Sequence, residues 1–208
     1  MELKIDQKKL SYVAYKKIKL LILQDMLKSS EKIIQEKMAQ KLGISRTPIL
    51  QALSVLQNER LIEYSPRKGF TVRKISNKEF HELLELRGAL EGFAVKRIAL
   101  NLDDGIKKQL LSYLNDFEKY FKENNIPKYS ETDKNFHFFI IESCGNSYLP
   151  HINDSFNILL LIYTKGFKVK LDVSIKTHRK IIEAIINKKG DEAAQLMEDH
   201  FETVKDYF

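Results

Sequence analysis

The chain has 208 residues, of which 43% are hydrophobic and 30% are charged, as in globular proteins that fold in water. No apolar run approaches the roughly 20 residues of a membrane-spanning helix, and the N-terminus lacks the apolar core of a secretory signal, so we expect a cytoplasmic protein that does not enter a membrane. Cys144 is the only cysteine, which excludes an intramolecular disulfide and a cysteine-rich zinc finger.

The charge is distributed unevenly along the sequence. Residues 1–76 contain 16 Lys and Arg against 7 Asp and Glu, a net charge of +9, whereas residues 77–208 contain 19 against 21, a net charge of −2. A basic N-terminal part joined to a nearly neutral remainder indicates a head that binds a polyanion. The alternative is that the lysines serve only solubility, but that reading does not explain the asymmetry.

Three helices are predicted in the basic part. Apolar residues at helical spacing indicate a first helix over about 11–28 and a second over about 35–42. Gly43 follows the second helix, in the position where glycine commonly ends helices. Ser45 is a good N-cap for a third helix that runs to about Asn58. A tight glycine-containing turn between two short helices is typical of a helix-turn-helix.

A basic hairpin follows the third helix. Residues 61–64 and 70–73 have the composition of short strands, and the segment 65–69, with a proline, two basic residues and a glycine, forms the turn between them. Helices followed by such a hairpin make a winged helix-turn-helix, which we assign to residues 1–75.

The third helix and the hairpin are the expected contacts to double-stranded DNA. Arg46 lies in the first turn of the helix and is the candidate for reading a base, with phosphate contact alone as the alternative. Gln51 can read an adenine. Arg67 and Lys68, at the wing tip, are expected to contact phosphates. The full set expected at DNA is Ser45, Arg46, Thr47, Gln51, Arg67, Lys68 and Gly69.

The remainder of the chain, residues 76–208, is predicted to be entirely helical. Ser76 and Glu79 form a capping box that opens the first helix of this domain. The fold class is therefore mostly α, with a six-helix bundle after the head. The expected helices cover about 77–101, 104–125, 128–143, 147–165, 174–188 and 191–206.

Four polar residues of this domain lie on apolar helix faces. Asp133 and His137 are four residues apart on one buried face, and His178 and His200 lie on the apolar stripes of two later helices. Burying them without partners would cost on the order of 1–3 kcal/mol each, whereas one shared cation satisfies all four. Three imidazoles and a carboxylate suit zinc first, with nickel, iron or manganese as alternatives. Taken singly, each histidine could instead be a hydrogen-bonded core residue.

Several motifs resemble one known family. The stretch 38–49, with Gly-Ile-Ser-Arg-Thr-Pro at its centre, closely resembles the GntR family of bacterial transcription regulators. The second domain is similar to the FadR-type FCD effector domain of that family, and six helices rather than seven place it nearer the VanR-like subgroup. The residues that carry this second resemblance are Leu86, Arg87, Leu90, Glu91, Asp133, Phe136, His137, Gly145, Asn146, His178 and His200.

The resemblance implies a homodimeric regulator, a repressor by family habit, that binds a pseudo-palindromic operator and responds to a small organic acid. It strengthens the assignment of the four residues above to a metal site. It also implies that Arg87 binds the carboxylate of the effector, the alternative being an ion pair with Glu91. For Asn146 we expect a left-handed turn that caps the next helix, with effector binding as the minority interpretation.

Some positions depart from the family pattern, and other functions stay open. Leu50 stands where the family often has an arginine that contacts DNA, so the operator cannot be taken from relatives. One alternative is a metal-responsive regulator in which the ion itself is the signal. Another is a metal-dependent hydrolase, although no separate general base is evident and the basic head would have no purpose. A nucleoid protein without sequence preference is the third.

Overall fold

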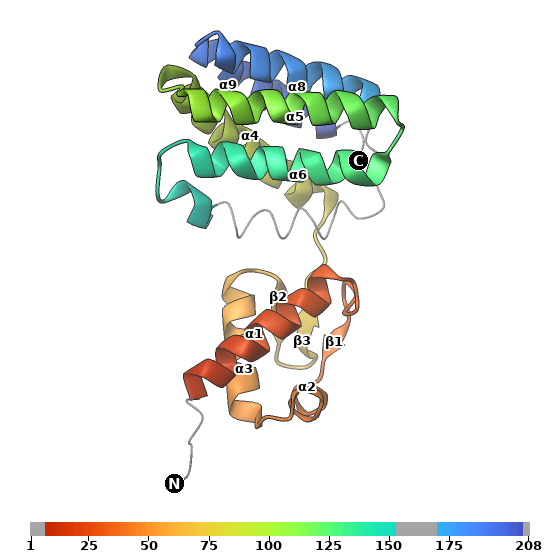
Figure 1. The fold of residues 1–208 in the computed structure, drawn as a ribbon. Coiled ribbons are helices and arrows are strands. Elements are labelled where there is room, and N and C mark those ends of the chain that lie inside the picture. The colour runs from red at the N-terminus through yellow and green to blue at the C-terminus, as the bar shows by residue number, and fades with distance from the viewer. Residues whose placement is uncertain (1–6, 153–169, 206–208) are drawn as a thin grey trace. The chain divides into compact units, whose positions relative to one another are not determined.

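The computed structural model describes residues 7–152 and 170–205 (Figure 1). The chain divides between Ser76 and Asn77 into two compact units, and each unit is described by itself. Among the described residues, none of the helices has the length and apolar character needed to cross a membrane.

The first unit is a winged helix-turn-helix, as the sequence predicts. Its three antiparallel strands are ordered β1-β3-β2, and Phe70 of β3 lies opposite both Ile33 and Tyr64. The elements are α1 (Gln7–Leu23), β1 (Lys32–Ile33), α2 (Gln35–Leu42), α3 (Arg46–Asn58), β2 (Ile62–Ser65) and β3 (Gly69–Val72).

Helix α3 packs one face into the core of this unit against α1. Ile18 and Ile22 of α1 and Ile49 and Leu53 of α3 are almost completely buried. The opposite face of α3 is exposed. Gly43 ends α2 in the left-handed conformation, with φ of 66°, as predicted.

Three details of this unit differ from the sequence-based expectation. Helix α1 ends at Leu23 rather than near residue 28, because the chain turns at Asp25, which has a φ of 61°. The strand β1 was not predicted, since two residues are too few to show an alternating pattern. Ser45 occupies the N-cap position of α3, but its side chain makes no capping hydrogen bond.

The second unit is a helical bundle, also as predicted. Residues 149–152 begin a further helix, but the rest of the helix expected over 147–165 lies mostly outside the described residues. The described helices are α4 (Asn77–Leu100), α5 (Asp104–Lys122), α6 (Ile126–Ser143), α8 (Leu171–Ile186) and α9 (Gly190–Lys205).

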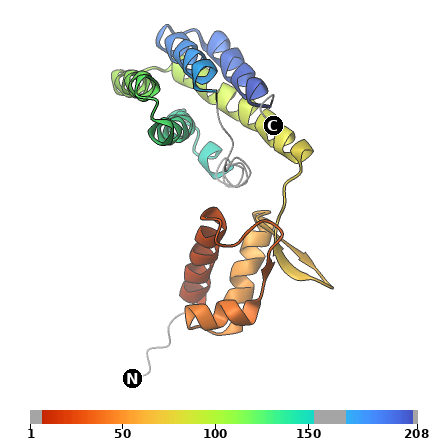
Figure 2. The ribbon, with the colours of Figure 1, turned by 90° about the vertical axis from the view of Figure 1, so that its right-hand side faces the viewer.

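Helices α4 and α9 lie side by side over most of their length (Figures 1 and 2). Gly92 of α4 permits the close approach. A Cβ atom added at Gly92 would lie 3.2 Å from Glu198 Oε1 and 3.3 Å from the Ala194 carbonyl oxygen. A Cβ atom added at Gly88 would have its nearest contact at 3.5 Å, to the Glu198 Cα. This approach brings His200 of α9 close to the polar residues of α4.

The two glycines should therefore respond differently to substitution. Gly92→Leu should destabilise the protein by about 1–3 kcal/mol, the usual cost of overpacking, because the new side chain meets the α9 backbone. Gly88→Ala should be neutral or stabilising by up to about 1 kcal/mol, since the methyl group fits and alanine favours helix. Urea denaturation of the two variants measures both effects. Equal stability of Gly92→Leu and the unmodified chain would show that the close approach is not required.

Candidate functional site

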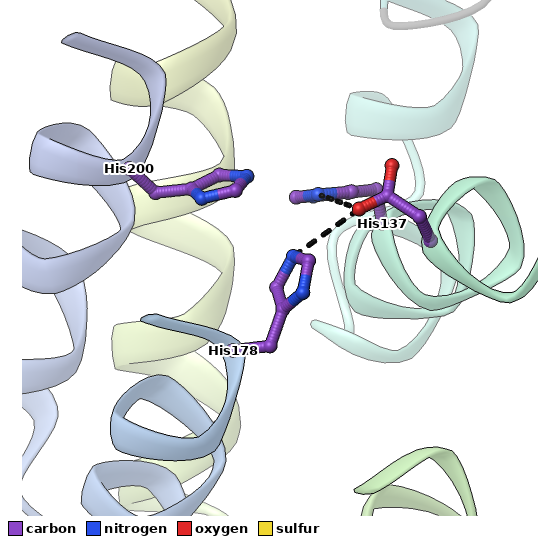
Figure 3. Close-up of side chains that lie close together, drawn as sticks. His137, His178 and His200 are labelled. Atoms are coloured by element: carbon purple, nitrogen blue, oxygen red, sulfur yellow. Dashed lines mark ion pairs between the residues drawn. The ribbon is translucent and has the colours of Figure 1, made fainter. Parts of the chain in front are cut away.

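The four predicted polar residues meet inside the second unit. Asp133 and His137 come from α6, His178 from α8 and His200 from α9, and one ligand atom of each lies within 4.8 Å of the others. Figure 3 shows the three imidazole rings converging from these separate helices. The spacing of four residues on α6 places Asp133 and His137 on one face, and the packing of α8 and α9 supplies the other two. The geometry is that of a small cage of one oxygen and three nitrogen ligands.

The cage lacks a satisfactory set of hydrogen bonds of its own. Asp133 Oδ1 lies 3.3 Å from His178 Nε2 and 3.8 Å from His137 Nε2. Yet His178 Nε2, which is fully buried, has no hydrogen-bond partner among the described residues. A buried nitrogen without a partner lowers the stability of the fold. A divalent transition metal bound by these four ligands would give His178 Nε2 a partner and remove that cost. The donor set therefore fits a metal ion.

Burial sets the protonation of these groups. Burial lowers the pKa of His200 to about 3 and the pKa values of His137 and His178 well below 6.5, so the three imidazoles are neutral near pH 7. Burial also raises the pKa of Asp133 to about 6. Neutral imidazoles with free lone pairs are the form that binds metal ions.

His137 is oriented by the carboxylate of Glu91, a contact that the sequence did not predict. Glu91 of α4 is completely buried, and its Oε2 lies 2.5 Å from His137 Nδ1. A carboxylate only accepts hydrogen bonds, so His137 donates from Nδ1 and keeps the Nε2 lone pair for the cage. Burial raises the pKa of Glu91, and the guanidinium of Arg87 opposes that rise.

His178 has a partner of a different kind. Tyr129 of α6 donates its hydroxyl hydrogen to Ser174 Oγ at 3.0 Å, and Ser174 Oγ lies 3.3 Å from His178 Nδ1. When His178 donates its Nδ1–H to the serine oxygen, its Nε2 faces the cage as a lone pair. Sequence reasoning missed Tyr129 and Ser174, although Ser174 lies one helical turn before His178 and could have been noticed on that ground.

Arg87 lies beside the cage and forms an ion pair with Glu91, which was the alternative to effector binding. Its Nε donates to Glu91 Oε1 at 2.6 Å, and its guanidinium carbon lies 4.7 Å from the centre of the Phe201 ring. Within the described part of the chain, the guanidinium uses only Nε in a hydrogen bond, so its terminal N–H groups can donate to a further acceptor.

The expected left-handed turn is one residue earlier than predicted. Gly145, with φ of 72°, takes that conformation, and Asn146 does not. The physical reason is that glycine has no Cβ and adopts positive φ without strain. Asn146 Oδ1 accepts a hydrogen bond from the backbone N–H of Tyr148 at 3.0 Å, so Asn146 does stabilise the following turn. Its role in effector binding stays a prediction.

The residues predicted to contact DNA lie on the surface of the first unit. Arg46, Thr47 and Gln51 are exposed on α3, next to Ser45, and Arg46 forms an ion pair with Glu36 of α2. The hairpin formed by β2 and β3 contains the other three members of the set. In this hairpin Arg67 and Lys68 are exposed, and Gly69 begins β3 with a φ of 78°.

The protonation of the cage predicts how stability depends on pH once any metal is removed. Each buried histidine binds a proton near pH 6.5 in the unfolded chain but not in the folded one. The unfolded state therefore binds more protons, and the free energy of unfolding should fall as the pH drops from 7 to 6, with a slope of up to about 1.4 kcal/mol per pH unit for each histidine. Asp133, with its raised pKa, acts in the opposite direction and does so mainly below about pH 6.

Denaturation of chelator-treated protein at pH 7.0, 6.5 and 6.0 measures this slope. His200→Gln should reduce it by one histidine's share, whereas substitution of the exposed His151 by Gln should not change it. A slope that is the same in all three proteins would contradict the assignment of neutral, buried imidazoles.

Comparison with known proteins gives two matching families. Residues 10–72 match the family described as bacterial regulatory proteins, gntR family, and residues 82–203 match the FCD domain. An uncharacterized HTH-type transcriptional regulator of Bacillus subtilis is 25% identical over 193 residues, covering 90% of this chain and 85% of the relative. The gluconate operon transcriptional repressor of Bacillus licheniformis is 24% identical, covering 90% of this chain and 80% of the relative.

Solved structures show the same fold. The E. coli protein McbR/YncC superposes with a TM-score of 0.70 at 18% identity, covering 94% of both chains. At that identity the likeness concerns the fold alone.

Proposed function

Because the chain belongs to the GntR family of bacterial transcriptional regulators and carries an FCD domain, we propose that it is a repressor whose operator affinity changes when a small carboxylic acid binds near a metal ion in the helical domain. The single observation that supports the effector site is the cage of three buried imidazoles and the partly exposed carboxylate of Asp133, which lies near Arg87. In this proposal residues 1–75 bind DNA and residues 76–208 bind the effector and form a homodimer. The family is one of regulators and not of enzymes, so the hydrolase interpretation is abandoned.

The proposed metal ligands are Asp133, His137, His178 and His200, with zinc the first candidate and nickel, iron or manganese as alternatives. A bound ion would supply a Lewis-acid position for an anionic ligand. The protein's own contribution is orientation: Glu91 and Ser174 hold two of the imidazoles with their Nε2 atoms toward the cage.

In this proposal the carboxylate of the effector is recognised by the terminal N–H groups of Arg87. Asn146 is a further candidate, because its side-chain amide can donate while its oxygen accepts from Tyr148. One relative is a gluconate operon repressor, which directs the first screen of ligands toward sugar acids. An effector changes operator affinity only if it binds two conformations of the dimer unequally.

A second candidate function is supported by the same cage. If the ion itself is the signal, then metal alone should change the affinity for DNA without any organic acid. The neutral imidazoles and the unpartnered His178 Nε2 favour metal binding in either case, so DNA binding with metal alone distinguishes the two functions.

The metal site is tested by removing one ligand at a time. His178→Ala and His200→Ala should lose bound metal and the thermal stabilisation that metal gives, because binding to the folded state raises stability by mass action. Elemental analysis and thermal unfolding, each with and without chelator, measure the two effects, and His151→Ala is the matched control. Unmodified protein that is purified without chelator, carries no metal and gains none from added zinc would contradict the site.

The DNA-binding surface is tested by comparing a base reader with a phosphate contact. Arg46→Ala should cost roughly 1–3 kcal/mol at the operator and relax one base position, whereas Lys68→Ala should weaken all DNA similarly and reduce the salt dependence by about one ion. Binding titrations at several salt concentrations separate these outcomes. Specific binding that survives Arg46→Ala unchanged would refute the assignment of Arg46.

A further inference from the structure

We infer that Leu50 reads the methyl group of a thymine in the operator, and so determines part of the DNA specificity. This inference rests on the proposed function, since it requires that α3 enters the major groove. Leu50 lies outside the set of residues predicted to contact DNA, and it is the apolar residue in the middle of that surface.

The first observation is the exposure pattern of α3. The helix buries Ile49 and Leu53 completely, whereas Leu50 is 41% exposed between them. Exposure of one leucine is common on protein surfaces and by itself indicates nothing. The helix also exposes Val55, at 45%, near its C-terminal end, so the argument depends on where Leu50 lies.

The second observation is the position of Leu50 among polar residues that face the same way. Leu50 follows Arg46 by four residues and Thr47 by three, so these three exposed side chains are neighbours on the helix surface. Gln51, the next residue in sequence, is also exposed. Along the helix axis Leu50 is about 6 Å from Arg46, which is roughly the rise of two base pairs. A helix that presents Arg46 and Gln51 to base edges therefore presents Leu50 to a base edge between or beside them.

The third observation is the charge around this position. Residues 1–76 carry a net charge of +9, although Arg46 itself forms an ion pair with the exposed Glu36 of α2. A polyanion is thus the partner that fits this unit. Leucine can neither donate nor accept a hydrogen bond, and the apolar feature of the major groove is the thymine C5 methyl group. The base that we expect Leu50 to contact is therefore thymine.

The experiment removes only that methyl group. Full-length protein is used to select binding sites from random duplex DNA, and each thymine of the selected site is then replaced singly by uracil, which pairs identically but lacks the methyl. Dissociation constants are measured at one salt concentration for the unmodified protein, for Leu50→Ala and for Val55→Ala as the matched control.

At one thymine per half-site, uracil should weaken binding of the unmodified protein by about fourfold, the value of one buried methyl group. Leu50→Ala should bind the thymine and uracil sites equally, while Val55→Ala should keep the full difference. A second variant, Leu50→Gln, should select sites in which that thymine is replaced, because glutamine pairs with adenine. Both Leu50 variants change an exposed helix position, and their melting temperatures verify folding.

Two results would overturn the inference. If no uracil substitution distinguishes the unmodified protein from Leu50→Ala, Leu50 does not read a methyl group, although selective binding still supports the proposed function. If the selection enriches no sequence at all, the proposed operator recognition fails, and the reading by Leu50 fails with it.

Discussion

The stability of the helical unit depends on giving each of several polar groups in its interior a hydrogen-bond partner or a ligand. Three imidazoles and a carboxylate from α6, α8 and α9 meet within 4.8 Å, and burial shifts all of their pKa values toward the uncharged forms. Such a group of residues is stable only if each polar atom finds a partner. Helix α4, which packs closely on α9 at Gly92, supplies Glu91 as the partner of His137 and Arg87 as the partner of Glu91.

This arrangement links the proposed effector contact to the proposed metal ligands. Arg87 donates to one oxygen of Glu91, and His137 lies against the other. An anion that draws the guanidinium of Arg87 away would leave Glu91 with a changed electrostatic environment, and Glu91 orients His137. In the proposed function, the buried carboxylate of Glu91 therefore couples the effector, which binds Arg87, to the metal ion, which binds His137.

Much of this architecture could be predicted from the sequence, and the reason is periodicity. Apolar spacing located the described helices to within a few residues, and the GntR and FCD assignments are confirmed by the matching families. The spacing of Asp133 and His137 on one face identified half of the cage. Glu91 and Tyr129 carry no such signal, because their roles arise from contacts between helices that are distant in sequence. Ser174 lies one helical turn before His178 and could have been noticed from that spacing. The strand β1 was missed because two residues show no alternating pattern, and the pairing of Arg46 with Glu36 was missed because it joins two different helices.

The most direct test of the account is release of the selected operator by small carboxylic acids, beginning with sugar acids, measured before and after chelation and again with Arg87→Lys. The account predicts that an acid changes operator affinity of the metal-loaded protein, that chelation abolishes the change, and that Arg87→Lys weakens it because lysine cannot bind a carboxylate in a bidentate manner. An acid response that is unaffected by chelation, or a response to metal alone with none to any acid, would contradict it.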